Sequence, residues 1–403
     1  SPDSACVRLN DEIQPRSMNP LHFLDFSAVS ALGPDRDTLF QNLIDRRPGL
    51  SYASSIVPST SSPLGEIPFA LPAPPPPLDR FHSRCHRIAY ACLRPLDASI
   101  RAVVEAFGAD RVGVVCGTSA SGNRSVEESW QNDGRFDFDY HHLHTFGCVS
   151  RLLKRLSSLQ GPAFSVSTAC SSGSNAIMSA ARLIHSGTCD AVVTGAVDSL
   201  CLTTYHGFQS LQIVDPDYCK PFDADRKGLN LGEGAAFFIL SSKPLADYPG
   251  IARLLGMGAS SDGYHMTAPD PEGLGAKLAM QRALEDAGLV PGDIDAINLH
   301  GTGTPLNDMA EARAVYQVFG DETPCSSTKG YTGHLLGAAA AIEIAACILS
   351  LLHGTVFANH GMSRQDPGIR IRLLTEHLRQ SVRRVVKNSF AFGGNNTSLV
   401  IGI

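Results

Sequence analysis

The sequence predicts an α/β protein whose chain folds as two similar halves. Short apolar segments alternate with helix-like segments along the chain, a pattern typical of mostly parallel sheets covered by helices. The alternation breaks near residues 245–256, and each half carries a small-residue, polar loop directly after an apolar segment. Open α/β sheets place their functional sites at such strand ends. With 403 residues, the chain is long enough for two domains or for one large duplicated domain.

The N-terminal half begins with a strand and a helix. Residues 21–31 are apolar and end at a Leu-Gly-Pro turn, which predicts a strand, and residues 35–46 have helical spacing of their apolar side chains. A second helix is expected over 86–108, followed by a buried strand over 111–119. Residues 58–80 are rich in Pro and Ser, include four consecutive prolines, and are expected to form a surface excursion.

Further strand and helix units follow the same pattern. A strand followed by a helix is expected at 163–187 and again at 294–320, and a strand is expected at 190–199. The final segment, 388–403, has aromatic residues beside paired glycines and then an apolar run. It predicts either a mobile, aromatic-tipped loop that acts as a gate or an ordinary hairpin with core phenylalanines.

The expected organisation has three regions. Residues 1–20 carry acidic side chains and no apolar run, so they are expected to be an N-terminal extension or a cloning remnant and not a signal peptide. The N-terminal half is expected over 21–250 and the C-terminal half over 251–403. The most apolar stretch, Leu335 to Leu352, is interrupted by Glu343 and predicts a buried helix and not a membrane span. We therefore expect a cytoplasmic protein.

Charge and cysteine content narrow the function classes. The formal net charge of -6 lacks the basic field that phosphate-backbone binding needs, so nucleic acid is not expected as a partner. The eleven cysteines include no CxxC pair, which argues against a disulfide framework, and no metal site is predicted. The loop at 117–122 lacks the Gly-Lys-Ser/Thr ending of a phosphate-binding loop, so no nucleotide cofactor is expected.

Cys170 is the first candidate for chemistry. It follows the apolar run FSVSTA and precedes a helical pattern, which places it at a strand-to-helix turn. A helix N-terminus lowers the pKa of a thiol and leaves free N–H groups that can hold an oxyanion. A buried structural cysteine is the equally weighted alternative for this residue taken alone.

Two loop histidines are the candidate partners of this thiol. His300 ends an apolar strand and precedes small hydroxyl residues, and His334 lies in a glycine-rich turn before an Ala-rich helix. Lys329 and Glu343 flank His334 in the same block. One cysteine with two loop histidines indicates thioester chemistry, whereas a surface position remains the simpler interpretation for His141, His142 and His144.

Five blocks in this order and spacing resemble the elongating β-ketoacyl-[acyl-carrier-protein] synthases, the type II ketosynthases of the thiolase superfamily. The resemblance spans about residues 21–403, and its blocks are STACSSGSNAI around Cys170, PFDADRKGLNLGEGAA at 221–236, HGTGTPLND at 300–308, KGYTGHLLGAAAAIE at 329–343 and NSFAFGGNN at 388–396. It implies a thiolase-like five-layer αβαβα fold with two pseudo-duplicated halves.

The resemblance also implies a decarboxylative Claisen condensation in fatty acid or polyketide/polyene chain elongation. Cys170 would carry the acyl chain as a thioester, and His300 and His334 would stabilise the enolate of a malonyl thioester. Lys329 would add positive charge to the catalytic set. The remaining implied roles are the oxyanion hole at the amides of Cys170 and Phe392, the gate at Phe392, substrate contacts at Thr302, Thr304, Phe390 and Ala120, and support from Glu343 and Asp308.

Partners and cofactors are implied in the same way. The acyl carrier protein would bring its own phosphopantetheine arm, so no separate organic cofactor is expected. A homodimer is usual, and a heterodimer with a catalytically inactive, chain-length-determining homologue is the other arrangement. A structural monovalent cation is implied near Asn298, Glu343, Asn388 and Ser389.

Other functions fit these residues less well. A non-catalytic chain-length partner subunit usually lacks the nucleophile, whereas this chain has Cys170. A degradative thiolase would have a second cysteine in the C-terminal block, and an initiating synthase would have a Cys-His-Asn set. Three departures from the family pattern concern specificity: Ala391 replaces a hinge glycine, Ala120 stands where some members have a bulky aliphatic residue, and the prolines at 71–77 form an insertion.

Overall fold

The strands of the computed structural model form two groups with the same internal order. The structure describes residues 19–57, 60–133 and 138–403, so almost all of the expected extension at 1–20 lies outside the described residues. The first group comprises β1 (Leu21–Ser30), β2 (Val112–Gly117), β3 (Ala163–Val166), β4 (Ala191–Asp198) and β5 (Gly234–Ser241). The second comprises β6 (Ala252–Ser261), β7 (Ala296–Asn298), β8 (Cys325–Ser326), β11 (Arg384–Ala391) and β12 (Asn395–Gly402).

Strand order shows the duplication directly. The groups run β3-β2-β4-β5-β1 and β8-β7-β11-β12-β6, which is the same order when each group is counted from its own first strand. In each, the last strand in sequence is antiparallel to both neighbours, and the three strands at the outer end of the group are parallel. The two groups join where Leu21–Phe23 of β1 pairs with 252–254 of β6, giving one ten-stranded sheet.

Helices cover both faces of each group and also separate the two groups. Those of the first half are α1 (Arg36–Ile44), α2 (Arg84–Leu93), α3 (Asp97–Phe107), α4 (Asn123–Asp133), α5 (Tyr140–Leu143), α6 (Gly147–Leu156), α7 (Ser172–His185) and α8 (Leu202–Ser210). Those of the second half are α9 (Leu274–Ala287), α10 (Pro305–Phe319), α11 (Lys329–Thr332) and α12 (Ala339–His353). A short ribbon of β9 (Thr355–Val356) and β10 (Leu378–Arg379) lies apart from the main sheet.

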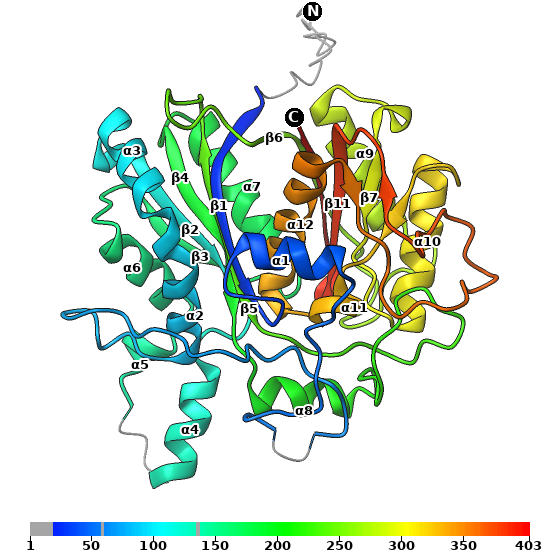
Figure 1. Cartoon of the computed structure of the whole chain (residues 1–403), viewed down its shortest axis with the longest axis horizontal. Helices are drawn as coiled ribbons and strands as arrows, with labels where there is room; N and C mark the ends of the chain where they lie inside the picture. The colour runs from blue at the N-terminus through cyan, green and yellow to red at the C-terminus, as the bar shows by residue number, and fades with distance from the viewer. Residues whose placement is uncertain (1–18, 58–59, 134–137) are drawn as a thin grey trace, which may run out of the picture.

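The result is the five-layer αβαβα arrangement. Figure 1 shows α2, α3 and α6 on one outer face, α9 and α10 on the other, and α7 with α12 between the two strand groups. The helices α7 and α12 approach closely at Gly173, where a Cβ would lie 3.0 Å from the backbone nitrogen of Ala341. The apolar segment Leu336–His353, long enough to cross a membrane, is 89% buried in this middle layer, as its interrupted apolar pattern predicts.

Several expected elements have different bounds in the structure. The helix expected over 86–108 is two helices, because Pro95 lacks an N–H and a 3₁₀ turn at Arg94–Leu96 separates α2 from α3. The strand expected over 294–304 shortens to β7, since its later residues form the His300 loop. The proline segment at 71–77 is irregular and mostly exposed, as expected of a surface excursion. Each cysteine in the described part of the chain is buried and unpaired.

Candidate functional site

Cys170 lies in the tight connection between β3 and α7. The preceding Ala169 adopts a φ of +52°, which lets the chain turn sharply into the helix that begins at Ser172. The thiol is 7% exposed and lines the main cavity of the described residues. The strand-to-helix turn predicted for this residue is therefore present, with the thiol between the sheet and the middle helix layer.

The protonation state of the thiol differs from the sequence expectation. Burial raises the pKa of Cys170 to about 11, although Lys329 and hydrogen bonds from the backbone amides of Phe392 and Cys170 act to lower it. Desolvation of the thiolate thus exceeds the stabilisation that the helix N-terminus and the nearby cation provide. The resting thiol is neutral, and the two amides that contact it are those to which the resemblance assigns the oxyanion hole.

Two carboxyl side chains of α10 position the backbone of the His300 loop. His300 N–H donates to Glu311 Oε1 at 2.7 Å, and Gly301 N–H donates to Glu311 Oε2 at 2.7 Å. Asp308 accepts from the amides of Thr302 and Gly303 at 3.0 and 3.2 Å. Burial raises the pKa of Glu311 to about 7 and raises that of Asp308 as well, against the lowering effect of these amides. The two carboxyl groups fix the loop on which the imidazole stands.

The tautomer of His334 follows from one hydrogen bond. Leu336 N–H donates to His334 Nδ1 at 3.0 Å, so Nδ1 is an acceptor and the neutral ring carries its proton on Nε2. Burial, with Lys329 and Lys387 nearby, holds the pKa of His334 well below its usual range. The backbone of the turn is fixed as well, because His334 N–H donates to Asn230 O at 2.7 Å. The PFDADRKGLNLGEGAA block therefore supports this histidine.

Lys329 sets the same tautomer for His300. Its Nζ lies 3.3 Å from His300 Nδ1, 2.5 Å from His300 O and 2.5 Å from Glu343 Oε1. An ammonium can only donate, so Nδ1 accepts and Nε2 bears the proton. Burial, followed by Lys329 and His334, lowers the pKa of His300 well below its usual range. Both histidines are thus neutral N–H donors, with ring centroids 5.5 Å apart.

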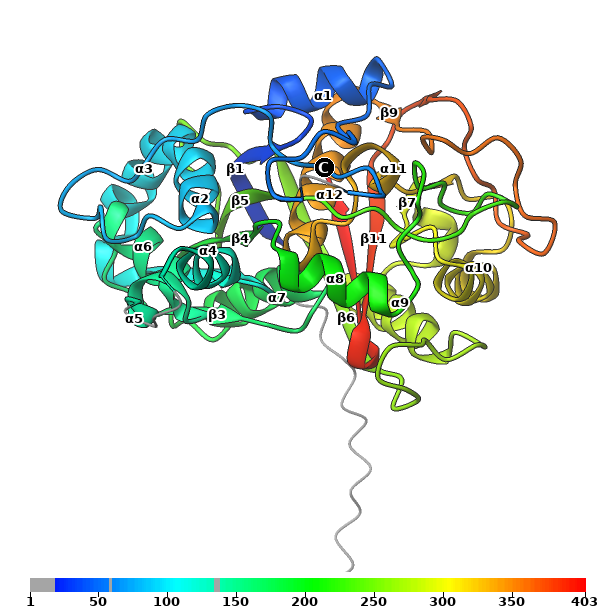
Figure 2. The same cartoon turned by 90° about the horizontal axis from the view of Figure 1, so that it is seen from below.

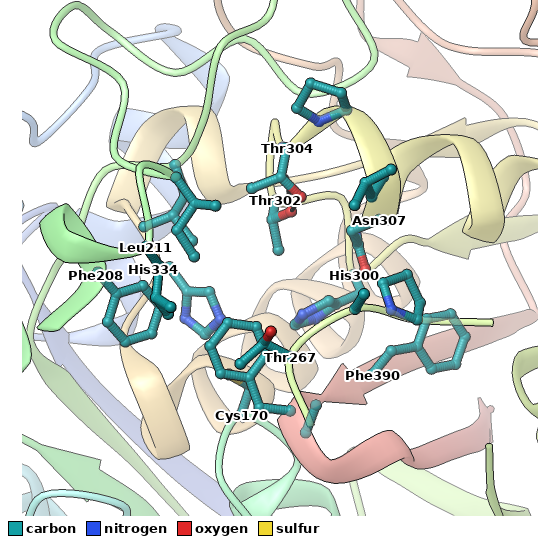
Figure 3. A pocket seen from close by; sticks show the side chains of 18 of the residues that line it. Cys170, Phe208, Leu211, Thr267, His300, Thr302, Thr304, Asn307, His334 and Phe390 are labelled. Atoms are coloured by element: carbon teal, nitrogen blue, oxygen red, sulfur yellow. Dashed lines mark hydrogen bonds between the residues drawn. The ribbon is translucent and has the colours of Figure 1, made fainter. Parts of the chain in front are cut away.

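Cys170, His300 and His334 line one cavity of about 410 Å³. Figure 3 shows both imidazole rings grouped with Cys170, while Thr302 and Thr304 stand further from the thiol in this view. The two threonine hydroxyls are 2.9 Å apart. Phe390 also lines the cavity, and Ala120 does not: it lies in a buried cluster with Tyr205, Leu200 and Leu336. The volume suits a small-molecule or pantetheine-sized ligand.

A turn of three residues, Phe392–Gly394, closes one side of the cavity. It connects β11 to β12, and Gly393 and Gly394 have φ values of +81° and +73°. Seen from below, α8 lies by the end of β11 (Figure 2), and Phe208 stacks on Phe392 with ring centroids 5.6 Å apart. Gly393 N–H donates to Met266 O at 2.8 Å, which ties the turn to a second loop.

Three buried charged residues of the site were not predicted. Glu311 is described above, and Asp198, at the end of β4, accepts from the amides of Ala120 and Gly337 at 2.9 and 2.7 Å. Lys387 lies 2.9 Å from Glu343 Oε2 and is completely buried. Asp198 could have been found from the sequence as a polar residue at the end of an apolar strand. No periodicity predicts Lys387, since a lysine in a strand is usually exposed.

No group of three His, Cys, Asp or Glu side chains that could hold a metal ion occurs within 19–57, 60–133 and 138–403. The polar groups of the site in these residues are a thiol, imidazoles, ammonium groups and carboxyl groups.

Comparisons with known proteins agree with this geometry. A model of the β-ketoacyl synthase N-terminal domain matches residues 79–246, and a model of the β-ketoacyl synthase C-terminal domain matches residues 251–363. The mitochondrial 3-oxoacyl-[acyl-carrier-protein] synthase of Arabidopsis thaliana is 39% identical over 259 residues, which cover 60% of this chain and 56% of that protein. This match spans less than two thirds of the relative's length.

Two other relatives match over more of their length. The 3-oxoacyl-[acyl-carrier-protein] synthase 2 of a Synechocystis strain is 33% identical over 343 residues, covering 80% of this chain and 81% of that protein. Among solved structures, a chain from the complex of the ketosynthase ApeO with its chain length factor ApeC, from Xenorhabdus doucetiae, has a TM-score of 0.88 and 39% identity. That comparison covers 95% of this chain and 98% of the other. With its duplicated α/β fold, its cysteine and two neutral histidines on one cavity, and these matches, this chain belongs to the β-ketoacyl synthase family.

Proposed function

We propose that the chain is a β-ketoacyl-acyl-carrier-protein synthase that extends an acyl chain by decarboxylative Claisen condensation with a malonyl carrier. The observation that carries the proposal is the convergence of one thiol and two neutral imidazole N–H donors on one cavity. Acyl transfer needs the thiol, and enolate stabilisation needs donors that do not protonate the enolate carbon.

Acyl loading is the first half-reaction. The Cys170 sulfur attacks the thioester carbonyl of the acyl carrier, and the amides of Cys170 and Phe392 stabilise the tetrahedral oxyanion. The carrier thiolate leaves and takes up the proton that Cys170 releases. Because burial raises the pKa of Cys170 to about 11, this proton must leave as the C–S bond forms. Lys329, which lowers that pKa, supplies the favourable field for the transfer.

Condensation is the second half-reaction. The Nε2–H groups of His300 and His334 donate to the thioester carbonyl oxygen of the malonyl carrier. The carboxylate leaves as carbon dioxide, and its bonding electrons form an enolate held by the two donors. The enolate carbon then attacks the Cys170 thioester, the C–S bond breaks as the 3-ketoacyl product forms, and the released sulfur takes up a proton from water to restore the neutral thiol. The lowered pKa values of both histidines keep them as donors without full proton transfer.

The acyl carrier protein and a second ketosynthase-like subunit are the proposed partners. Thr302 and Thr304 line the outer part of the cavity, where their hydroxyls can contact a pantetheine arm. Strand β3 is an edge strand of the sheet and is only partly buried, so its free side can pair with another chain. Such an edge is available for a homodimer or for a heterodimer with a chain-length partner, and similarity to the ApeO–ApeC complex supports the second arrangement.

Pathway and chain length belong to the proposal as well. Fatty acid and polyketide or polyene elongation use the same three catalytic groups, and Ala391 and Ala120 favour the dedicated polyketide or polyene route. Ser119 Oγ donates to Ala169 O at 2.9 Å, so the Ala120 loop contacts the turn that carries Cys170. Position 120 itself contributes only a methyl group to the buried cluster that contains Tyr205 and Leu336.

Intact-protein mass spectrometry tests the function. The wild-type chain is incubated with a panel of acyl carriers and then with malonyl carrier, beside Cys170→Ala and His334→Ala. We expect an acyl adduct on wild type and on His334→Ala but not on Cys170→Ala, and discharge as 3-ketoacyl product by wild type alone. Absence of any adduct on wild type would favour the alternative of a non-catalytic chain-length partner. Equal loss of both half-reactions in His334→Ala would contradict the division of roles.

A further inference from the structure

The buried charges behind the two histidines include one lysine more than the described reaction uses. Lys329 contacts His300 and one carboxylate oxygen of Glu343. Lys387, on β11, contacts the other carboxylate oxygen at 2.9 Å, and both lysine side chains are completely buried. A buried ammonium is costly unless it is paired, so a second lysine on one carboxylate needs an explanation.

The ammonium of Lys387 lies among oxygen atoms. It forms an ion pair with Glu343 Oε2 and donates hydrogen bonds to the backbone carbonyl of Asn388 and to Ser389 Oγ, the latter at 3.2 Å. One carboxylate oxygen and two neutral oxygens therefore surround this buried charge. Asn298 is the neighbour of Lys387 in the parallel β7–β11 ladder, and its buried Oδ1 has no hydrogen-bond partner within the described residues.

These surroundings are the four residues near which the family resemblance implies a monovalent cation. Three of them, Glu343, Asn388 and Ser389, already give oxygen atoms to the Lys387 ammonium. A free ion placed among them would stand against this positive charge in a buried environment, where repulsion is strong. The residues present therefore do not fit an additional cation.

We propose that Lys387 is a positioning residue whose ammonium takes the place of a diffusible monovalent cation. It balances Glu343, which then holds Lys329 against the His300 loop, and it adds a fixed positive charge near both imidazoles. Because Lys387 lowers the pKa of His300 and His334, the fixed charge helps to keep them as neutral donors. The inference deepens the proposed function, and its main readout does not depend on that function.

Melting temperature in different salts tests the proposal. Wild-type protein is melted in potassium, sodium and choline chloride at one ionic strength of about 0.1 M, where exposed charges are largely screened beyond roughly 10 Å. We expect the same melting temperature in all three salts. A saturable rise with potassium or sodium in wild type would overturn the proposal, since it would show that a free ion binds despite Lys387.

Substitution of the lysine supplies the second arm. Lys387→Ala removes the ammonium and leaves space beside Glu343, so in choline chloride we expect melting to fall by roughly 5 °C or more. Potassium or ammonium ions should restore much of that loss, and in the same salts they should restore the condensation rate after a fall of about tenfold. Lys387→Met is the matched control, because it fills the space without charge and should respond to neither ion.

Each remaining outcome has a defined meaning. Lys387→Ala that melts like wild type in choline chloride, or that shows the same response to ions as Lys387→Met, would contradict the charge-replacement role. If Lys387→Ala fails to fold, the wild-type salt comparison still decides whether a free cation binds. Wild-type protein that loads no acyl chain would count against the proposed function but leave the melting comparison valid.

Discussion

At the residue scale, protonation decides what the site can do. The thiol of Cys170 and the imidazoles of His300 and His334 are all neutral at physiological pH, because burial disfavours the charged form of each group. Cys170 therefore forms no thiolate–imidazolium ion pair with either histidine in the resting site. In the proposed reaction, proton transfer would therefore accompany acyl loading, and the histidines would act as hydrogen-bond donors during decarboxylation.

Alkylation of the thiol should rise steeply with pH. A pKa of about 11 means that the thiolate fraction of Cys170 grows about tenfold for each pH unit below that value. We expect the rate of modification by iodoacetamide, followed by intact mass, to increase in this way from about pH 7 to pH 9. Cys170→Ala corrects for the other cysteines. A rate that levels off below pH 9 would show that a thiolate already exists at neutral pH.

Ala391 precedes the turn at Phe392–Gly394 without straining the backbone. Its φ of -128° and ψ of 155° are ordinary extended values, so alanine adopts this backbone conformation without strain. Ala391→Gly should lower the free energy of unfolding by about 0.5–1 kcal/mol and make the turn more mobile. We expect faster acyl loading and a lower urea midpoint. Ala391→Val, which favours extended backbone, should slow loading, and equal loading rates in both variants would remove this residue from gating.

At the element scale, strand ends hold the catalytic loops together. Asp198 closes β4 and accepts hydrogen bonds from Thr118 Oγ1 at 2.6 Å, from Ala120 N–H and from Gly337 N–H. It thereby joins the loop after β2 to the turn that follows His334. A Cβ at Gly337 would lie 2.7 Å from Asp198 Oδ2, so this close approach requires glycine.

Removing the charge of Asp198 should loosen this junction. Asp198→Asn replaces acceptor oxygens with an amide that cannot accept every bond, so we expect a loss of about 2–3 kcal/mol in unfolding free energy. The condensation rate should fall more than the loading rate, because the turn after His334 is released. Urea unfolding and the two half-reactions measure these effects. Asp190→Asn, which breaks a half-exposed pair with Arg111, is the control and should cost at most about 1 kcal/mol.

At the scale of the whole molecule, the unpaired edge at β3 predicts an assembly. Phe164 on this strand is 38% exposed, although strand β3 belongs to the main sheet. Phe164→Asp should shift the protein from dimer to monomer, or prevent copurification with a chain-length partner, as measured by light scattering after size exclusion. Leu278→Asp, on the outer helix α9 at a similar 40% exposure, should leave assembly unchanged. A monomeric wild type that also binds no partner would contradict the prediction.

Local patterns predict the architecture better than they predict the charges. The alternation of strands and helices indicates the duplicated α/β fold, and motif order indicates that Cys170, His300 and His334 meet. The sequence could not predict that Lys387 is buried beside Glu343, or that the pKa of the Cys170 thiol is raised. Both features depend on how completely the middle layer excludes water. The break between α2 and α3 was missed although Pro95 marks it, since the flanking segments share helical periodicity.

The pairing of β1 has a consequence for synthesis of the chain. Leu21, Phe23 and Phe26 lie on this early strand and are buried in the finished protein, yet its partners β5 and β6 begin only at Gly234 and Ala252. At about 5–20 residues per second, a ribosome needs roughly 10–40 s to make the intervening residues. Throughout that interval the strand has no native partner, so the nascent chain presents an apolar segment suited to chaperone binding. Completion of the sheet marks the end of that exposure.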